Sequence, residues 1–498
     1  MDDATEAPAT TGIVVIGAGA AGLSAAVTAA RLGARVVVLE GADRPRAGGN
    51  TRWSVGVSRI AHGSRAGLAE LIAPAALDGD LFVPPYDATH YIDDLHTAGK
   101  GATDPMLARR VAERSLPLVK WWKKLGARFE VAPARFGRPD GSVSSDPGLP
   151  SGAGLMLTGG GAALIDLLVD VALASGVEIR FGHRVVDLRR ASDGGPALTV
   201  STADGAYTLT PDAVVLASGG FAGSPAARAR YLGPDWDIVR VRGSSENTGV
   251  LIERALELGA QAAGHWSGMH AVASAPEGPY IPDMNTSDVF GRYAYPYGVT
   301  VNARGERFFD EGAGPKNLTY STIGAHIHRQ PDHLAFQVFD QRGIPLLEPR
   351  YATSKPAVAD SIAGLARAIG IVASQLERTI RDYNAACSTD APFDPYELDG
   401  VKALPDGQPA KSNWATPIDS PPFAAYPVVP AMTFMFAGLK VDASARVLDT
   451  DGKPVPGLWA CGDTVGGLAV HALPAGTGMI AAGVFGRIAG ANAAEATA

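Results

Sequence analysis

The feature that most constrains this chain is a glycine-rich turn between a short apolar run and a helix of small residues. Residues 13–16 (IVVI) are typical of a buried strand, and residues 17–22 (GAGAAG) follow directly. In a G-x-G-x-x-G turn, Gly17 allows the tight bend, Gly19 lets a pyrophosphate approach the backbone, and Gly22 lets helix and strand pack closely. The phosphates would rest on N–H groups at the helix N-terminus. The turn therefore predicts a dinucleotide site.

A second apolar run supports this prediction over a glycine-rich turn without a ligand. Residues 34–40 (ARVVVLE) follow the helix and Gly33, a residue type common just after a helix end, and the run ends at Glu40. A carboxylate at that point accepts hydrogen bonds from a ribose. Strand, helix, strand and acid thus occur in the order of a Rossmann-like α/β unit.

Composition limits the possible partners and locations. The 498 residues carry a net charge of −8, which disfavours nucleic acid, and no uninterrupted apolar stretch is long enough for membrane insertion. The two cysteines, Cys387 and Cys461, cannot form a disulfide framework or hold an iron–sulfur cluster. Residues 1–11 are acidic and lack the apolar stretch of a signal peptide. We expect a cytoplasmic protein without a metal site.

Small residues elsewhere in the chain are placed to contact the same cofactor. Residues 48–52 (GGNTR) follow the first unit, residues 213–221 end a fully apolar strand with glycines, and Asn247 and Gly249 precede a helix. Near the end of the chain, residues 457–463 (GLWACGD) and 475–480 (AGTGMI) form another strand end and another glycine turn into a helix. A cofactor held by both ends of the chain must be long, and FAD is long enough.

The chain is therefore expected to hold FAD in a domain formed by 1–272 and 426–498, with 273–425 as an inserted second domain. The expected cofactor-binding residues are Gly17, Gly19, Ala20, Ala21, Gly22, Glu40, Gly41, Gly48, Gly49, Asn50, Thr51, Arg52, Val185, Ala217, Ser218, Gly219, Asn247, Gly249, Gly462, Asp463, Gly476, Thr477, Gly478, Met479 and Ile480.

These segments together resemble the fumarate reductase/succinate dehydrogenase flavoprotein superfamily. The resemblance rests on GAGAAG (17–22), GGNT (48–51), VVLASGGF (214–221), VNARGERFFDE (301–311) and GLWACGD (457–463). Within the superfamily, residues 266–272 (WSGMHAV) look most like FAD-dependent tricarballylate dehydrogenases, and residues 474–478 (PAGTG) are similar to a segment of 3-ketosteroid dehydrogenases.

The resemblance implies a fold and a reaction. The fold is an α/β FAD-binding domain of the glutathione-reductase type with an inserted α+β cap. The reaction is dehydrogenation at adjacent carbons next to a carboxylate or carbonyl, with hydride passing to flavin N5. Some relatives attach FAD through a histidine beside the glycine pair, but this chain has Asn50 and Thr51 there, so non-covalent FAD is expected.

The resemblance also points to candidate catalytic residues. Fumarate reductases carry an arginine acid shortly after the VNxxGxRFxxE stretch, where this chain has Lys316 and Tyr320, so either could transfer the proton. Lysine would need a lowered pKa for that role. His270 and His471 match substrate-binding histidines, and Arg292 is a candidate anion anchor.

The sequence is compatible with several substrates and with either reaction direction. The expected substrate is a small polycarboxylate such as tricarballylate. The alternatives are a 3-ketosteroid or other bulky carbonyl compound, a fumarate-reductase-like enzyme working in the reducing direction, and a flavin-binding regulatory protein without turnover. A separate electron acceptor or donor is expected, because the chain has no CxxCH haem site and no cysteine cluster.

Overall fold

The computed structural model describes residues 12–72, 85–131, 152, 154–280, 288–388, 392–395 and 398–498. Residues 1–11, from which the absence of a signal peptide was expected, lie outside the described residues.

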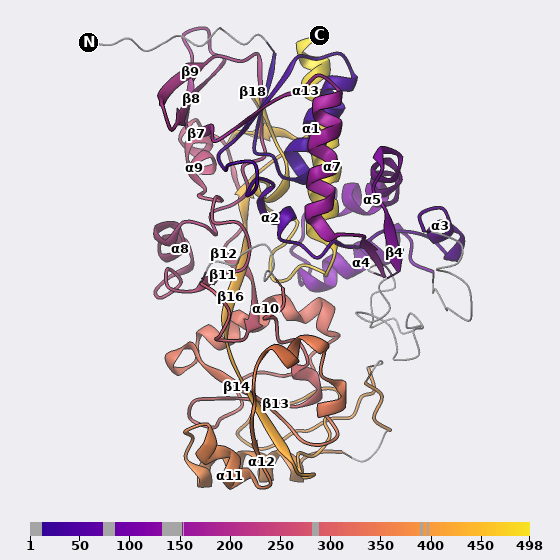
Figure 1. Ribbon diagram of the computed structural model, residues 1–498, viewed down its shortest axis with the longest axis vertical. Coiled ribbons are helices and arrows are strands. Elements are labelled where there is room, and N and C mark those ends of the chain that lie inside the picture. Colours follow the sequence, from indigo (N-terminus) through magenta and orange to yellow (C-terminus); the bar gives the residue numbers. More distant parts are fainter. Residues whose placement is uncertain are drawn as a thin grey trace.

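A six-stranded sheet forms the upper part of the molecule (Figure 1). Its strand order is β17 (Arg446–Leu448), β18 (Pro454–Ala460), β10 (Ala213–Leu216), β1 (Ile13–Ile16), β2 (Val36–Glu40) and β6 (Glu178–Phe181). All neighbours pair in parallel except the edge strand β17. Ile16 and Leu216 pair where β1 and β10 end, and loops leaving these adjacent carboxyl ends form the crevice where such sheets bind ligands.

Apolar strands and small-residue helices form the core of this part. Every residue of β1, β2 and β10 is buried, which is why these runs are continuously apolar. Helix α1 (Ala20–Arg31) packs on α13 (Thr477–Thr497) and α7 (Gly160–Ala174), and α13 also packs on α5 (Pro105–Leu125). The α/β class expected from the sequence is confirmed.

Shorter elements surround this sheet. Antiparallel sheets are formed by β3 (Val57–Ser58), β5 (Leu155–Leu157) and β4 (Phe129–Val131), and by β7 (Arg184–Arg190), β8 (Pro196–Thr202) and β9 (Gly205–Leu209). The helices here are α2 (Gly49–Arg52), α3 (Arg65–Ala69), α4 (Ala88–Ala98), α8 (Pro225–Leu232) and α9 (Val250–Glu257).

A second sheet extends through the lower part of the molecule (Figure 1). Its long strand β16 (Phe423–Leu439) pairs with β11 (Arg240–Val241), β12 (Ala262–Ser274), β14 (Ala335–Phe339) and β15 (Ala357–Ala359), and β13 (Val299–Asn302) pairs with β14. Helices α10 (Lys316–His328), α11 (Ile362–Ala368) and α12 (Ala373–Ala385) belong to this part.

The two long strands connect both parts of the molecule. The domain boundaries expected at 272/273 and 425/426 fall inside β12 and β16, which pair antiparallel from Ala262–Leu439 to Ser274–Val429. These exact boundaries stay a prediction. Within the described residues, no helix is both long and apolar enough to span a membrane.

Candidate cofactor and substrate site

The turn between β1 and α1 requires glycine at two positions. Gly17 has a φ of +106°, and a Cβ there would lie 2.4 Å from the Ala217 carbonyl oxygen. A Cβ at Gly22 would lie 1.9 Å from the Gly17 carbonyl oxygen. Gly19 is the N-cap of α1, so no side chain of that residue covers the first-turn N–H groups, which can face a phosphate.

Two buried carboxylates lie at the ends of parallel strands. Glu40 accepts hydrogen bonds from the N–H groups of Ala18 at 2.7 Å and Ala42 at 2.8 Å, and burial raises its pKa. Burial raises the pKa of Asp463 to about 6, although Asn50 donates a hydrogen bond to it at 3.3 Å. Each carboxylate retains acceptor capacity for a sugar or ribityl hydroxyl.

The C-terminal glycine turn brings the start of α13 to the same place. Gly476 is the N-cap of α13 with a φ of +81°, and a Cβ there would lie 2.7 Å from the Arg59 backbone nitrogen. Gly476, Gly478 and Met479 line the cavity that Gly17 and Gly19 also line. The positive end of the α13 dipole thus faces a space where added negative charge would be stabilised.

One continuous cavity gathers most of the expected cofactor residues. Its walls include Gly17, Gly19, Ala20, Ala21, Glu40, Gly41, Gly49, Asn50, Thr51, Val185, Ala217, Ser218, Gly219, Asn247, Gly249, Gly462, Asp463, Gly476, Gly478 and Met479. Sequence positions more than 450 residues apart therefore share one ligand space.

Five expected cofactor residues do not line the cavity. Gly22 packs against Gly17, a Cβ at Gly48 would point at Ile165, and Ile480 is fully buried. The Arg52 guanidinium binds Asp166 at 2.7 Å, and the Thr477 hydroxyl accepts a hydrogen bond from Tyr91 at 3.1 Å. These side chains shape the surrounding backbone.

A histidine–tyrosine pair lies at the far end of the same cavity. His270 Nε2 on β12 is 3.0 Å from the hydroxyl of Tyr320 on α10, and both line the cavity. His270 is 4% exposed, and burial together with the charge of Arg242 lowers its pKa to about 3. The rings of Tyr293 and Phe434 lie against this pair. His270 is therefore a neutral hydrogen-bonding partner of Tyr320 at ordinary pH.

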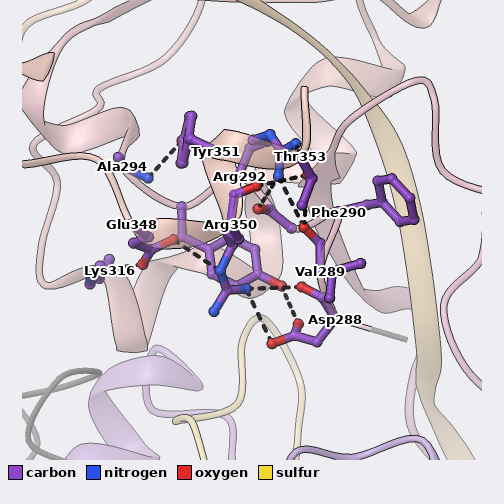
Figure 2. Close-up of polar contacts among 12 residues, drawn as sticks. Asp288, Val289, Phe290, Arg292, Ala294, Lys316, Glu348, Arg350, Tyr351 and Thr353 are labelled. Carbon is purple, nitrogen blue, oxygen red and sulfur yellow. Dashed lines mark hydrogen bonds and ion pairs between the residues drawn. The ribbon is translucent and has the colours of Figure 1, made fainter. Parts of the chain in front are cut away.

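Beside this pair, three basic side chains share two carboxylates. Arg242 pairs with Asp288. Arg350 binds Asp288 at 3.1 Å and Glu348 at 3.4 Å, and Lys316 binds Glu348 at 2.9 Å (Figure 2). Burial alone would lower the pKa of Lys316, but the charge and hydrogen bond of Glu348 raise it. Lys316 thus lacks the lowered pKa that a proton-transfer role would need.

Two other candidate catalytic residues lie away from the cavity. Arg292 is fully buried, and its guanidinium donates hydrogen bonds to Thr353 at 2.8 Å, Ser354 at 2.6 Å and neighbouring carbonyl groups (Figure 2). His471 is exposed and packs edge-on against His265. Neither side chain lines the cavity, so the structure does not bring Arg292 or His471 to the expected substrate site.

Sequence reasoning missed several residues that line the cavity. Arg242 follows β11, a strand of two residues, and pairing with β16 places its guanidinium 2.9 Å from the Thr433 hydroxyl. Glu348 precedes a short 3₁₀ segment without a recognisable motif. The available signal was the spacing of Arg240 and Arg242, because side chains two residues apart in a strand lie on the same face and give it a basic character.

Comparisons with known proteins agree with this geometry. A family model described as FAD binding domain matches residues 12–479. The chain belongs to this flavoprotein family, that of fumarate reductases and succinate dehydrogenases.

Individual relatives of this flavoprotein are named for different activities. A probable fumarate reductase, Ifc3, of Shewanella frigidimarina is 27% identical, with 98% of this chain and 75% of that protein covered. The 4-oxocyclohexanecarboxylate 2-dehydrogenase of Sinomonas cyclohexanicum is 26% identical, with 91% of this chain and 87% of that protein covered.

A solved structure shows the same fold. The 3-ketosteroid-Δ4-(5α)-dehydrogenase of Rhodococcus jostii RHA1 superposes with a TM-score of 0.72 at 22% identity, with 98% of both chains covered. The expected FAD-binding domain with an inserted capping domain is thereby confirmed.

The residues present fit FAD. The glycine cradle at 17–22, the buried carboxylates of Glu40 and Asp463 and the start of α13 provide phosphate, hydroxyl and ring contacts along one cavity. The flavoprotein is an FAD-dependent oxidoreductase acting on CH–CH groups.

Proposed function

We propose that this flavoprotein forms or reduces a C=C bond α,β to the carbonyl group of a substrate that carries at most one carboxylate. The observation that carries the proposal is the pairing of each basic side chain at the substrate end of the cavity with Asp288 or Glu348. The polycarboxylate expected from the sequence is the weaker candidate.

The charge balance supports a substrate of low charge. Among the described residues here, Arg242, Lys316 and Arg350 are opposed by Asp288 and Glu348, which leaves one positive charge, and His270 is neutral. A tricarboxylate would bring three negative charges beside two buried carboxylates. Like charges repel strongly in such a poorly solvated space.

The chain offers Tyr320 for proton transfer. Its hydroxyl lies 3.0 Å from Nε2 of the neutral His270 imidazole, within hydrogen-bond distance, and the positive charge of Arg242 favours the anionic, basic form of the tyrosine oxygen. A carbonyl acidifies the neighbouring C–H, so an oxygen base at this position can remove that proton in dehydrogenation and return it in reduction. Lys316, held as a cation by Glu348, can orient the substrate electrostatically.

Bound FAD supplies the two-electron oxidant or reductant. We infer that it is held non-covalently, because Asn50 and Thr51 stand where some relatives carry an attachment histidine, and Asn50 is engaged with Asp463 and the Thr433 carbonyl. A separate electron partner and a reducing, cytoplasmic location remain part of the proposal. Both cysteines, Cys387 and Cys461, are free.

A relative's activity supports the substrate class. The Sinomonas enzyme is named for 4-oxocyclohexanecarboxylate, a ketone with a single carboxylate. That combination matches a site in which three basic side chains and two carboxylates leave a net charge of +1 beside a tyrosine–histidine pair. Fumarate reduction, the activity named for the Shewanella relative, requires binding of a dicarboxylate and is less well supported.

Anaerobic mixing of the oxidised holoenzyme with candidate substrates tests the proposal. We expect 4-oxocyclohexanecarboxylate or 4-androstene-3,17-dione to bleach the flavin absorbance, and tricarballylate to leave it unchanged. Reduced enzyme should likewise be reoxidised by an α,β-unsaturated ketone faster than by fumarate. Bleaching by tricarballylate alone would overturn the substrate assignment.

A variant tests whether the ion pairs select against polycarboxylates. Glu348→Gln removes the carboxylate that neutralises Lys316 and Arg350. It should increase binding of a dicarboxylate inhibitor, measured by flavin spectral perturbation, by at least about tenfold. An unchanged affinity would mean that the ion pairs do not select against polycarboxylates.

A further inference from the structure

A second cavity lies between helices α5 and α13, outside the cofactor site. It has a volume of about 320 Å³, which falls in the range of small-molecule sites. Its lining includes three arginines, Arg110, Arg114 and Arg487, together with Asn492. Pro117 and Val484 are among its apolar walls.

The spacing of the α5 residues explains how they share one wall. Residues three or four positions apart lie along one face of a helix. Arg114 stands in this relation to Arg110, Pro117 and Leu118 in α5. Pro117 inside α5 lacks the N–H that would continue the helical ladder. The face it belongs to meets α13, which lies next to α5 (Figure 1).

Arg487 contributes the buried end of the cluster. Its Nε atom is buried without a hydrogen-bond partner, and its guanidinium lies 4.7 Å from the centre of the Trp121 ring. Burial and the positive charge of Arg114 lower the pKa of Arg487. A buried guanidinium nitrogen without an acceptor is costly unless a ligand supplies one.

No carboxylate balances this cluster in the part of the chain that the structure describes. None of the three arginines forms an ion pair there. The carboxylate of Asp442, which precedes the lining residues Ala443 and Ser444, is held by Arg446 at 2.7 Å. Such a gathering of unopposed positive charge is unusual in a protein with a net charge of −8.

We propose that the α5–α13 cavity is a binding site for a phosphate-bearing small molecule. Guanidinium groups present paired N–H donors that match phosphate oxygens, and two or three arginines balance a phosphate dianion. The apolar wall formed by Pro117, Leu118, Val484 and Ile488 leaves room for an organic group attached to the phosphate.

The site is separate from the cofactor cavity but shares helix α13 with it. Ala482 lines the cofactor cavity and Val484 lines the arginine cavity. Binding is therefore tested on the FAD-loaded enzyme, in which the pyrophosphate cradle at 17–22 is filled.

Calorimetric titration of the holoenzyme with inorganic phosphate and with phenyl phosphate, at fixed ionic strength, tests the proposal. We expect saturable binding that Arg487→Gln and Arg114→Gln each weaken at least tenfold. Arg109→Gln, an exposed α5 arginine that does not line the cavity, should leave the affinity within twofold. Tighter binding of phenyl phosphate would identify the natural ligand as an ester, and equal affinity would identify free phosphate.

Two results would overturn the assignment. One is the absence of saturable binding by either probe to the holoenzyme. The other is binding that the Arg487 and Arg114 variants retain but Arg242→Gln abolishes, which would place the anion in the substrate cavity. Each variant is first checked for retained flavin absorbance and an unchanged denaturation midpoint, and Arg487→Lys, which keeps the charge, covers the case in which Arg487→Gln does not fold.

Discussion

At the scale of single residues, the site depends on a histidine that stays uncharged. His270 lies between Tyr320, Phe434 and the charge of Arg242, and both burial and that charge oppose its protonation. A neutral imidazole can accept or donate through Nε2, which suits a partner of a tyrosine that must gain and lose a proton.

Tyr320→Phe tests this role directly. Removing the hydroxyl should slow flavin reduction by the substrate about 100-fold or more, the usual loss for a general acid–base group, while FAD stays bound. Stopped-flow absorbance at the flavin band measures the rate. The control is Tyr207→Phe, which removes a hydroxyl that is hydrogen-bonded to His183 and does not line the cavity. Equal rates for both variants would exclude Tyr320 as the proton-transfer group.

The low pKa of His270 also predicts a pH dependence of stability. The folded protein holds it near 3 against an ordinary value of 6.5, so the unfolded chain binds more protons between these pH values. The free energy of unfolding should therefore be highest above pH 6.5 and fall as the pH decreases toward 3.

Urea unfolding at pH 7 and pH 5 measures how much His270 contributes to this change in the free energy of unfolding. Between pH 7 and pH 5 the free energy of unfolding of the wild type should fall by about 2 kcal/mol more than that of His270→Gln, since one pKa unit corresponds to about 1.4 kcal/mol. A His270→Gln variant with the wild-type pH dependence would contradict the low pKa.

At the scale of elements, the crossing of α1 and α13 holds the two glycine turns together. A Cβ at Gly486 would lie 2.2 Å from the Ala21 carbonyl oxygen, and one at Gly490 would lie 2.2 Å from that of Ala25. The backbones can approach this closely only with glycine at both positions. The close crossing brings the start of α13 to the β1–α1 turn.

Gly490→Ala should force these helices apart. We expect a loss of at least about 2 kcal/mol in unfolding free energy, together with weaker retention of FAD, because overpacking against backbone cannot be relieved by a rotamer change. Chemical denaturation and the flavin-to-protein absorbance ratio measure the two effects. Ala496→Ser, on the exposed side of α13, should change neither. Full stability of Gly490→Ala would show that the crossing tolerates a wider spacing.

At the scale of the whole molecule, the cavity joins parts of the chain that local structure does not connect. Its cofactor end is lined by the ends of β1 and β2, the loops after β10 and β18 and the start of α13, and its substrate end by β12, α10 and β16. The long strands β12 and β16 extend between these ends, so the FAD-binding part and the cap share one sheet.

Hydrogen exchange should report this arrangement. Adding FAD to apoprotein should increase protection at residues 17–22 and 476–482 in the same concentration range, because one ligand contacts both. Helices α11 and α12, whose buried residues belong to a separate core cluster, should change little. Mass spectrometry of peptic peptides measures the effect. Protection at only one of the two glycine turns would contradict a shared cofactor site.

From the sequence follow the βαβ unit, the α/β class and the cofactor, and most of the cofactor residues expected from it line the cavity. These features rest on local rules: Gly17 and Gly22 are required by the turn itself, Glu40 is the last residue of β2, and Asp463 lies in the short turn after β18. Neighbours along the chain specify them, so spacing alone predicts them.

Only the tertiary structure decided which side chains meet at the substrate end. Strand pairing with β16 places His270 and Arg242 there, and α10 adds Tyr320, while Arg292 and His471 lie elsewhere. Glu348 binds Lys316 from 32 residues away and thereby raises its pKa. Such contacts depend on the packing of distant segments and on charges that no local spacing encodes.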